Sequence, residues 1–194
     1  MKIREWYHSR YVDDLRVMMM HEAGAIPYLQ KAIEDQNPDI IIELGTANAG
    51  LTLALHECKR QALLFSFDLM SAFVNPKCLE DMTEQQIDYF LRNGFNGNVN
   101  FIIGDILSIP FKPLIKILKR DKRKFLYCDN GGKGKEITMY SQYLRPGDML
   151  GVHDWGVEVN IKTDGVEKAL ENFERHYLNE LFKHHNFRTR LFLR

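Results

Sequence analysis

Residues 38–50 read PDIIIELGTANAG and contain the clearest structural signal in the chain. An apolar run at 40–42 leads to an acid, Glu43, and then to a turn with glycines at 45 and 50. The run is too short for a helix and does not alternate with polar residues, so it predicts a strand that is covered on both faces. A buried strand that ends in a glycine-rich turn is typical of a parallel sheet whose strands are joined by helices.

Four further short apolar runs share this form, each with an acid at or near its end. They span residues 63–68, 101–105, 125–129 and 149–154. Helical spacing, capping residues or an initiating proline mark the segments between them, at residues 51–58, 83–91, 113–118 and 137–144. Strands that alternate with helices predict an α/β fold with a Rossmann-like, doubly wound, mostly parallel sheet.

The two ends of the chain fit this plan less directly. Residues 1–37 predict two helices that form an N-terminal helical cap on the sheet or a lid over its crevice, and residues 38–194 predict one globular unit. Near the other end, a helical stripe predicts one long helix that buries Val166, Leu170, Phe173, Tyr177 and Leu181. Only residues 187–194 then remain, which leaves room for one strand. The sheet is therefore either shortened or completed by a partner chain, and the second alternative predicts a homodimer.

Composition limits the classes of function. The 194 residues contain 26 lysines and arginines and 26 aspartates and glutamates, so the formal net charge is zero. Zero net charge gives no general reason to expect nucleic acid or an anionic membrane as a partner, and no apolar run approaches the about 18 residues that span a bilayer. Seven basic residues lie between Lys112 and Lys124, which we interpret as an exposed helix face. The three cysteines are scattered, which is typical of a reducing, cytoplasmic location.

Acids follow the strands at one edge of the predicted sheet. The carboxyl ends of parallel strands meet at the same edge, where open α/β sheets bind their ligands. A single acid in such a place often only caps the next helix, but five together indicate a negatively lined crevice. Such a crevice suits a ligand with hydroxyls, amines or positive charge, or a divalent metal. The acids are Glu43, Asp68, Asp105, Asp129 and Asp154.

The glycine-rich turn narrows the choice of ligand. Gly45, Ala47 and Gly50 overlay a dinucleotide-binding GxGxxG pattern with its second glycine replaced, and Asp68 follows at the distance of a ribose-binding acid. The Ala47 methyl group and the Glu43 charge both disfavour the pyrophosphate of NAD. A cofactor with an amine and a sulfonium and without phosphate, namely S-adenosylmethionine, fits better.

The ordered set of motifs resembles the class I S-adenosylmethionine-dependent methyltransferases. Within that class it is similar to the cephalosporin hydroxylase and sugar O-methyltransferase group, and more distantly to the catechol O-methyltransferase type. The resemblance covers roughly residues 26–156 and rests on residues 38–46, 68, 104–105, 127–130, 144–148 and 152–155. It implies a class I methyltransferase fold and cofactor contacts from Glu43, Gly45, Thr46, Ala47, Asp68, Leu69, Asp105 and Asp129.

The resemblance also implies a reaction centre at Asp129. In the metal-dependent branches, the corresponding acid and a pair after the fifth strand hold magnesium; here that pair is His153 and Asp154. Compared with the cephalosporin hydroxylase type, His153 replaces an acid. If Asp154 is instead matched to the acid of the catechol type's Asp-Asn pair, Trp155 replaces the asparagine, so one oxygen ligand is missing in either alignment. Magnesium prefers oxygen ligands, whereas histidine suits manganese, iron or zinc. His153 or Lys133 would then remove the proton of the acceptor hydroxyl, or a metal would weaken it.

The sequence thus predicts an S-adenosylmethionine-dependent O-methyltransferase for a small hydroxylated molecule, a sugar or natural product. Two alternatives stay open at this point. One is an NAD-type oxidoreductase, and the other is a catalytically inactive cofactor-binding protein. The acceptor itself is not encoded in any motif, because lids and loops form such pockets.

Overall fold

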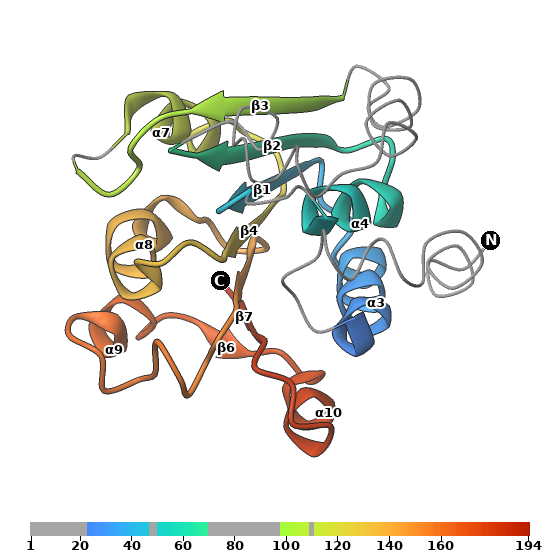
Figure 1. Ribbon diagram of the computed structural model, residues 1–194, viewed down its shortest axis with the longest axis vertical. Helices are drawn as coiled ribbons and strands as arrows, with labels where there is room; N and C mark the ends of the chain where they lie inside the picture. Colours follow the sequence, from blue (N-terminus) through green and yellow to red (C-terminus); the bar gives the residue numbers. More distant parts are fainter. Residues whose placement is uncertain (1–22, 47–49, 70–97, 109–110) are drawn as a thin grey trace, which may run out of the picture.

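The computed structural model describes residues 23–46, 50–69, 98–108 and 111–194. This part of the chain forms one seven-stranded sheet with helices on both faces (Figure 1). The strands are β1 (Ile40–Leu44), β2 (Leu63–Asp68), β3 (Val99–Ile103), β4 (Lys124–Cys128), β5 (Met149–Val152), β6 (Glu174–Arg175) and β7 (Arg190–Leu193). The helices are α3 (Ile26–Gln36), α4 (Gly50–Cys58), α7 (Lys112–Leu118), α8 (Lys133–Tyr140), α9 (Val166–Ala169) and α10 (Asn179–His184), with 3-10 turns η1 (Ala23–Ala25) and η2 (Ser141–Tyr143).

The strand order is β3-β2-β1-β4-β5-β7-β6. β1 lies in the interior of the sheet and pairs in parallel with both β2 and β4, while β7 runs antiparallel to β5 and β6. The direction of winding therefore reverses between β1 and β4, which is the place where such sheets form a ligand crevice. The predicted doubly wound, mostly parallel sheet is confirmed, and all five strands expected from the apolar runs are present.

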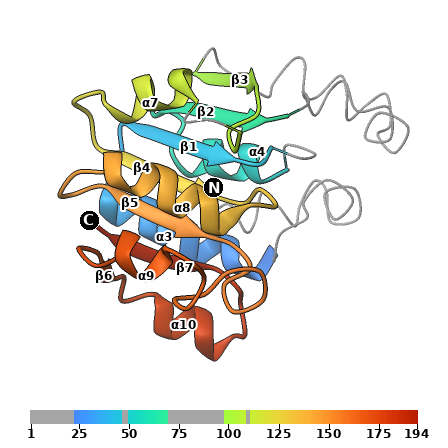
Figure 2. The ribbon, with the colours of Figure 1, turned by 90° about the vertical axis from the view of Figure 1, so that its left-hand side faces the viewer.

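Two helical layers cover the sheet, as Figures 1 and 2 show. Ile40, Ile42 and Leu44 of β1 join the core that includes α7, α8 and α9, whereas Ile41 joins the core that includes α3, α4 and α10. β1 is buried along its whole length. This two-sided burial explains why its sequence is a continuous apolar run rather than an alternating one.

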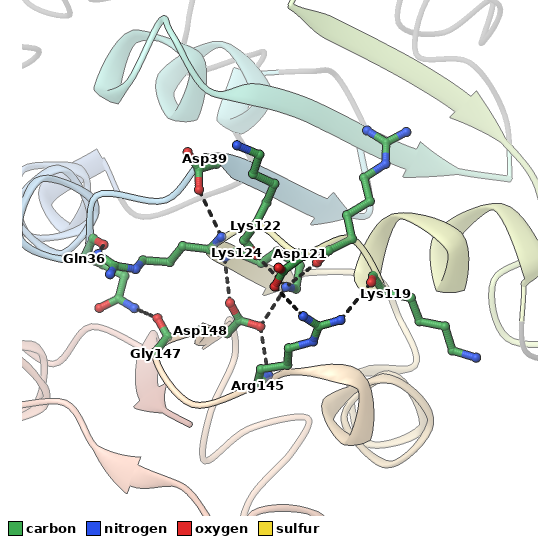
Figure 3. A network of polar contacts seen from close by, with 11 residues as sticks. Gln36, Asp39, Lys119, Asp121, Lys122, Lys124, Arg145, Gly147 and Asp148 are labelled. Carbon is green, nitrogen blue, oxygen red and sulfur yellow. Dashed lines mark hydrogen bonds and ion pairs between the residues drawn. The ribbon is translucent and has the colours of Figure 1, made fainter.

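The amino ends of β4 and β5 are joined by a buried ion pair (Figure 3). The side chain of Lys124 is fully buried, and its Nζ atom lies 3.0 Å from Oδ2 of Asp148. The same ammonium donates to the carbonyl oxygens of Arg120 and Lys122, and Asp148 accepts the N–H groups of Lys124 and Arg145. Lys124 thus departs from the exposed basic face expected for residues 112–124, whose other six basic residues are exposed.

The prediction of one long helix after residue 164 is wrong. α9 ends at Ala169, β6 follows, and α10 begins only at Asn179. Tyr177 is 59% exposed and Leu181 is 42% exposed, while Leu178 and Phe182 are buried instead. The segment pairs with the sheet edge, and this tertiary pairing overrides the helical spacing of its apolar residues.

Two strands, β7 and β6, form the side of the sheet beyond β5. β7 is the single strand expected near the end of the chain, and β6 adds a second strand of two residues that lies earlier in the sequence. Beyond β6, the N–H of His176 donates to the carbonyl oxygen of Leu191, and the side-chain amide of Asn179 bonds both the N–H and the carbonyl of Leu191. The alternative of a shortened sheet is therefore wrong, because β6 and β7 supply two strands beyond β5 within the chain. The homodimer stays a prediction.

The described part of the N-terminal region, which includes helix α3, belongs to one of the two helical layers that cover the sheet. Ile26, Leu29 and Ile33 of α3 are buried, as their spacing predicts, and α3 packs beside α4. The earlier predicted helix (residues 7–18) and the helix at 83–91 lie outside the described residues. The division at residue 37 stays a prediction. Among the described residues, no helix is long and apolar enough to cross a membrane.

Candidate active site

Asp129 and His153 lie side by side where β4 and β5 end. The two strands are parallel neighbours that pair Cys128 with Val152, and the N–H of His153 donates to the carbonyl oxygen of Cys128. The next residue of each strand therefore reaches the same point, and Nδ1 of His153 lies 2.7 Å from Oδ1 of Asp129. Asp154 has a left-handed backbone, with φ of 53°, and its Oδ2 lies 3.4 Å from the same nitrogen. The structure thus brings together three of the residues that the sequence predicted as a site.

Lys133 joins this group from α8. Its side chain is only 4% exposed, and its Nζ atom lies 3.7 Å from Oδ1 of Asp129 and 3.3 Å from Oδ2 of Asp154. The same ammonium donates to Oε2 of Glu158 at 2.6 Å. Sequence reasoning missed Glu158, which lies in a turn after β5 and carries no motif. The only available signal was its position four residues after Asp154.

The environment favours a charged lysine. Burial lowers the pKa of Lys133, but the hydrogen bond to Glu158 and the charges of Asp129 and Asp154 outweigh it, so the pKa is raised above its ordinary value. Burial also raises the pKa of Asp129, against the hydrogen bond to His153 and the positive charge of Lys133. Lys133 is therefore suited to act as a cation near neutral pH and not as a general base, whereas burial makes Asp129 more basic.

The glycine-rich turn lies directly against this cluster. Gly45 has a φ of +100°, and a Cβ atom there would come within 2.6 Å of the carbonyl oxygen of Asp129. The N–H of Asp129 in turn donates to the carbonyl oxygen of Leu44. Only glycine fits this conformation and this approach. The turn after β1 and the cluster after β4 are therefore in direct contact where the two strands end.

Glu43 lies beneath the turn and is fully buried. It accepts hydrogen bonds from the hydroxyls of Ser66, at 2.5 Å, and Thr52, and the hydroxyl of Thr46 bonds that of Ser66 at 2.6 Å. Burial raises the pKa of Glu43 to about 8, in spite of these hydrogen bonds. Its Oε1 atom has no hydrogen-bond donor among the described residues. Glu43 and Thr46 are thus parts of a hydroxyl network that holds the turn from below.

The other expected cofactor residues lie further along the same edge. Asp68 ends β2 and is half-buried, and Leu69 is 57% exposed. Asp105, after β3, is exposed and accepts the N–H groups of Leu107 and Ser108, so it also closes a turn. Asp68 and the residue before Asp105 are joined through a backbone hydrogen bond. Ala47 lies outside the described residues.

The expected metal ligands satisfy part of what a metal needs. Asp129, His153 and Asp154 each offer one donor atom, and these atoms lie within 4.8 Å of one another. One nitrogen and two carboxylate oxygens suit manganese, iron or zinc better than magnesium. The ammonium of Lys133, however, already lies beside both carboxylates. The donor atoms are close enough for an ion, but their charge is already offset.

Comparison with solved structures identifies the fold. A methyltransferase from Podospora anserina, bound to S-adenosylhomocysteine, matches with a TM-score of 0.58 and 14% identity over 98% of this chain and 85% of that chain. A putative caffeoyl-CoA O-methyltransferase from Staphylococcus aureus matches with a TM-score of 0.56 and 12% identity over 97% of this chain and 90% of that one.

A third match is a TDP-rhamnose 3'-O-methyltransferase of calicheamicin biosynthesis, with a TM-score of 0.55 and 16% identity over 94% of this chain and 84% of that one. No family model matches the sequence, and no curated protein matches it. The chain has the Rossmann-like fold of class I methyltransferases, as its motifs predicted. At these identities, the likeness concerns the fold alone.

Proposed function

We propose that this protein transfers a methyl group from S-adenosylmethionine to a hydroxyl group of a small molecule. The observation that carries the proposal is the contact between the Gly45 turn and the Asp129–His153–Lys133 cluster. In this fold the turn is where a cofactor would bind. In the cluster beside it, the Asp129 carboxylate lies 2.7 Å from the His153 imidazole and 3.7 Å from the Lys133 ammonium. A cofactor and an acceptor bound there would meet at one point of the crevice.

The residues at the edge suit this cofactor. Asp68 would accept hydrogen bonds from ribose hydroxyls, and the exposed Leu69 offers an apolar contact for adenine. Glu43 would act from below by fixing the hydroxyls of Thr52 and Ser66, and through Ser66 that of Thr46. Asp105 would lie near the adenine amine. When bound, S-adenosylmethionine supplies a methyl group on a sulfonium and leaves as S-adenosylhomocysteine once the acceptor oxygen has taken that methyl.

The cluster would activate the acceptor. Asp129 accepts a hydrogen bond from the acceptor hydroxyl and takes its proton as the new O–CH₃ bond forms. His153, 2.7 Å away, holds the carboxylate and shares the proton. Lys133 stays an ammonium and stabilises negative charge on the acceptor oxygen. Positioning of the two reactants supplies much of the acceleration, and no step in this scheme uses a metal.

The acceptor class follows from the site and from related folds. The matched structures include enzymes named for a sugar nucleotide and for a caffeoyl thioester, both small molecules with hydroxyl groups. A crevice lined by acids favours such a hydroxylated acceptor, so we propose a sugar or natural product.

The two described cysteines, Cys58 and Cys128, are free thiols, which fits the expected reducing cytoplasm.

A binding experiment tests the proposal first. Thermal unfolding is followed with S-adenosylmethionine, S-adenosylhomocysteine and NAD in parallel. A ligand at 100 times its dissociation constant adds about 2.7 kcal/mol to the free energy of unfolding, which raises the melting temperature of a chain of this size by roughly 5–10 °C. We expect shifts with the two adenosyl ligands and none with NAD.

A radiolabelled methyl group then reports turnover against a panel of sugars and phenols. A thermal shift with NAD alone would replace the proposal by an oxidoreductase. Binding of S-adenosylmethionine without methyl transfer to any acceptor would favour a cofactor-binding protein that has no catalytic role.

A further inference from the structure

The cluster after β4 and β5 contains its own cations. Three carboxylates, those of Asp129, Asp154 and Glu158, lie around the Lys133 ammonium. On the other side of Asp154, Nη1 of Arg188 lies 3.6 Å from Oδ1. Three negative side chains thus face two positive ones, and the excess charge is far smaller than the acids alone suggest.

The position of Lys133 is set by its surroundings. Its stem begins at the first residue of α8 and is buried, and its ammonium is anchored on Glu158 at 2.6 Å. Glu158 belongs to a turn whose N–H groups bond the carbonyl oxygen of Asp154. The helix and the turn therefore hold the ammonium between the two carboxylates that a metal would need.

A divalent ion and this ammonium would compete for the same place. An ion bound to an oxygen of Asp129 or Asp154 at the usual distance of about 2.1 Å would lie no farther than about 6 Å from the Lys133 nitrogen. Like charges at that separation repel strongly in a partly buried site. In addition, Nδ1 of His153 and Oδ1 of Asp129 are bonded to each other, and an ion that used either of these atoms would have to break that contact.

We propose that the ammonium of Lys133 takes the place of a divalent metal in this centre, so that the protein binds no such ion there, while Asp129, His153 and Asp154 form a latent metal site that the lysine keeps closed. The inference concerns cation binding alone. It holds or fails independently of whether the protein transfers methyl groups.

Manganese binding tests the inference directly. Free Mn²⁺ is measured by electron paramagnetic resonance as it is titrated into the full chain, without cofactor or acceptor, at neutral pH. The variant Lys133→Met removes the charge and keeps the apolar stem. We expect this variant to bind Mn²⁺ at least about tenfold more tightly than the wild type, because one repulsive charge has left the site. Adding Asp154→Asn to it should abolish the gain.

Two controls make the result decisive. Lys135→Met removes an exposed lysine from the same helix and should leave Mn²⁺ binding at the wild-type level. If Lys133→Met does not unfold cooperatively, Lys133→Gln replaces it, since an amide can still donate to Glu158. Equal Mn²⁺ affinity in the wild type and the lysine variant would overturn the inference, because the ion and the lysine would then coexist. Absence of binding in a folded variant would overturn it as well, since the three donors would then form no latent site.

Discussion

One buried lysine lies at the amino ends of the parallel strands, here called the amino edge, and another lies at their carboxyl ends, here called the carboxyl edge. The two lysines differ in the groups that surround them. Lys124, at the amino edge, faces one carboxylate, that of Asp148, and its remaining hydrogens go to two backbone carbonyls (Figure 3). Lys133, at the carboxyl edge, faces three carboxylates, and one of them, Asp129, is also bonded to His153. At the amino edge, one ammonium faces one carboxylate, and its other two hydrogen bonds go to backbone carbonyls. At the carboxyl edge, carboxylates outnumber the ammonium that they surround.

We interpret this difference as that between a structural ion pair and a cluster suited to reaction. A matched buried pair has no group left for another partner, so its removal affects stability. A cluster with excess acid can accept a proton or a hydrogen bond from a ligand, so changes to it affect binding or turnover. The carboxyl edge also adjoins the Gly45 turn.

The largest expected effect is at the carboxyl edge. Asp129→Ala removes the carboxylate that we propose as the partner of the acceptor hydroxyl, and we expect turnover to fall by about 10²–10⁴-fold. The affinity for S-adenosylmethionine should stay within a few fold, because Asp129 contacts the Gly45 turn, the proposed cofactor site, through its backbone. Single-turnover methyl transfer and calorimetry measure the two quantities. Glu167→Ala, which removes an exposed acid of α9, is the control and should change neither. Undiminished turnover in Asp129→Ala would exclude Asp129 from the reaction.

The second effect is at the amino edge and concerns stability. Asp148→Asn leaves the Lys124 ammonium buried without a countercharge, and we expect the free energy of unfolding to fall by about 3–5 kcal/mol. Urea denaturation measures this loss, and the activity of the folded fraction should be unchanged. Loss of activity without loss of stability would contradict the assignment of stability to the amino edge and of reaction to the carboxyl edge.

A third test uses a buried carboxyl held by hydroxyls instead of an ammonium. The folded-state pKa of Glu43 is about 8, above its ordinary value near 4.5, so the folded protein keeps this proton longer than the unfolded chain does. The contribution of the protonated Glu43 side chain to the free energy of unfolding is therefore fully present below about pH 4.5, and it is lost as the pH rises to about 8. We expect wild-type stability to drop by about 3 kcal/mol between about pH 5.5 and 8 relative to Glu43→Gln, whose side chain stays neutral. Urea denaturation at both pH values measures the difference, and parallel curves for the two proteins would contradict it.

The sequence predicted the sheet and the meeting of its acids for a physical reason. Runs such as residues 40–42 and 125–128 are apolar because both faces are covered, and parallel strands necessarily end together. The partners of Asp129 followed from its place beside β5. The segment after residue 164 was not predictable in the same way, because its conformation depends on edge pairing with Leu191. Glu158 was not predicted because it reaches Lys133 from a turn, and a turn has no repeated spacing in the sequence.

The smallest expected effect lies in the same network as Asp148. Asp121 bonds Arg145 at 2.7 Å, as closely as many buried pairs, but its side chain is 98% exposed. Water already solvates both charges, so Asp121→Asn should change the free energy of unfolding by less than about 0.5 kcal/mol. Urea denaturation of this variant beside Asp148→Asn compares two carboxylates that are linked through one arginine residue and differ in burial. A loss as large as that of Asp148→Asn would mean that ion-pair geometry, and not burial of Lys124, stabilises the amino edge.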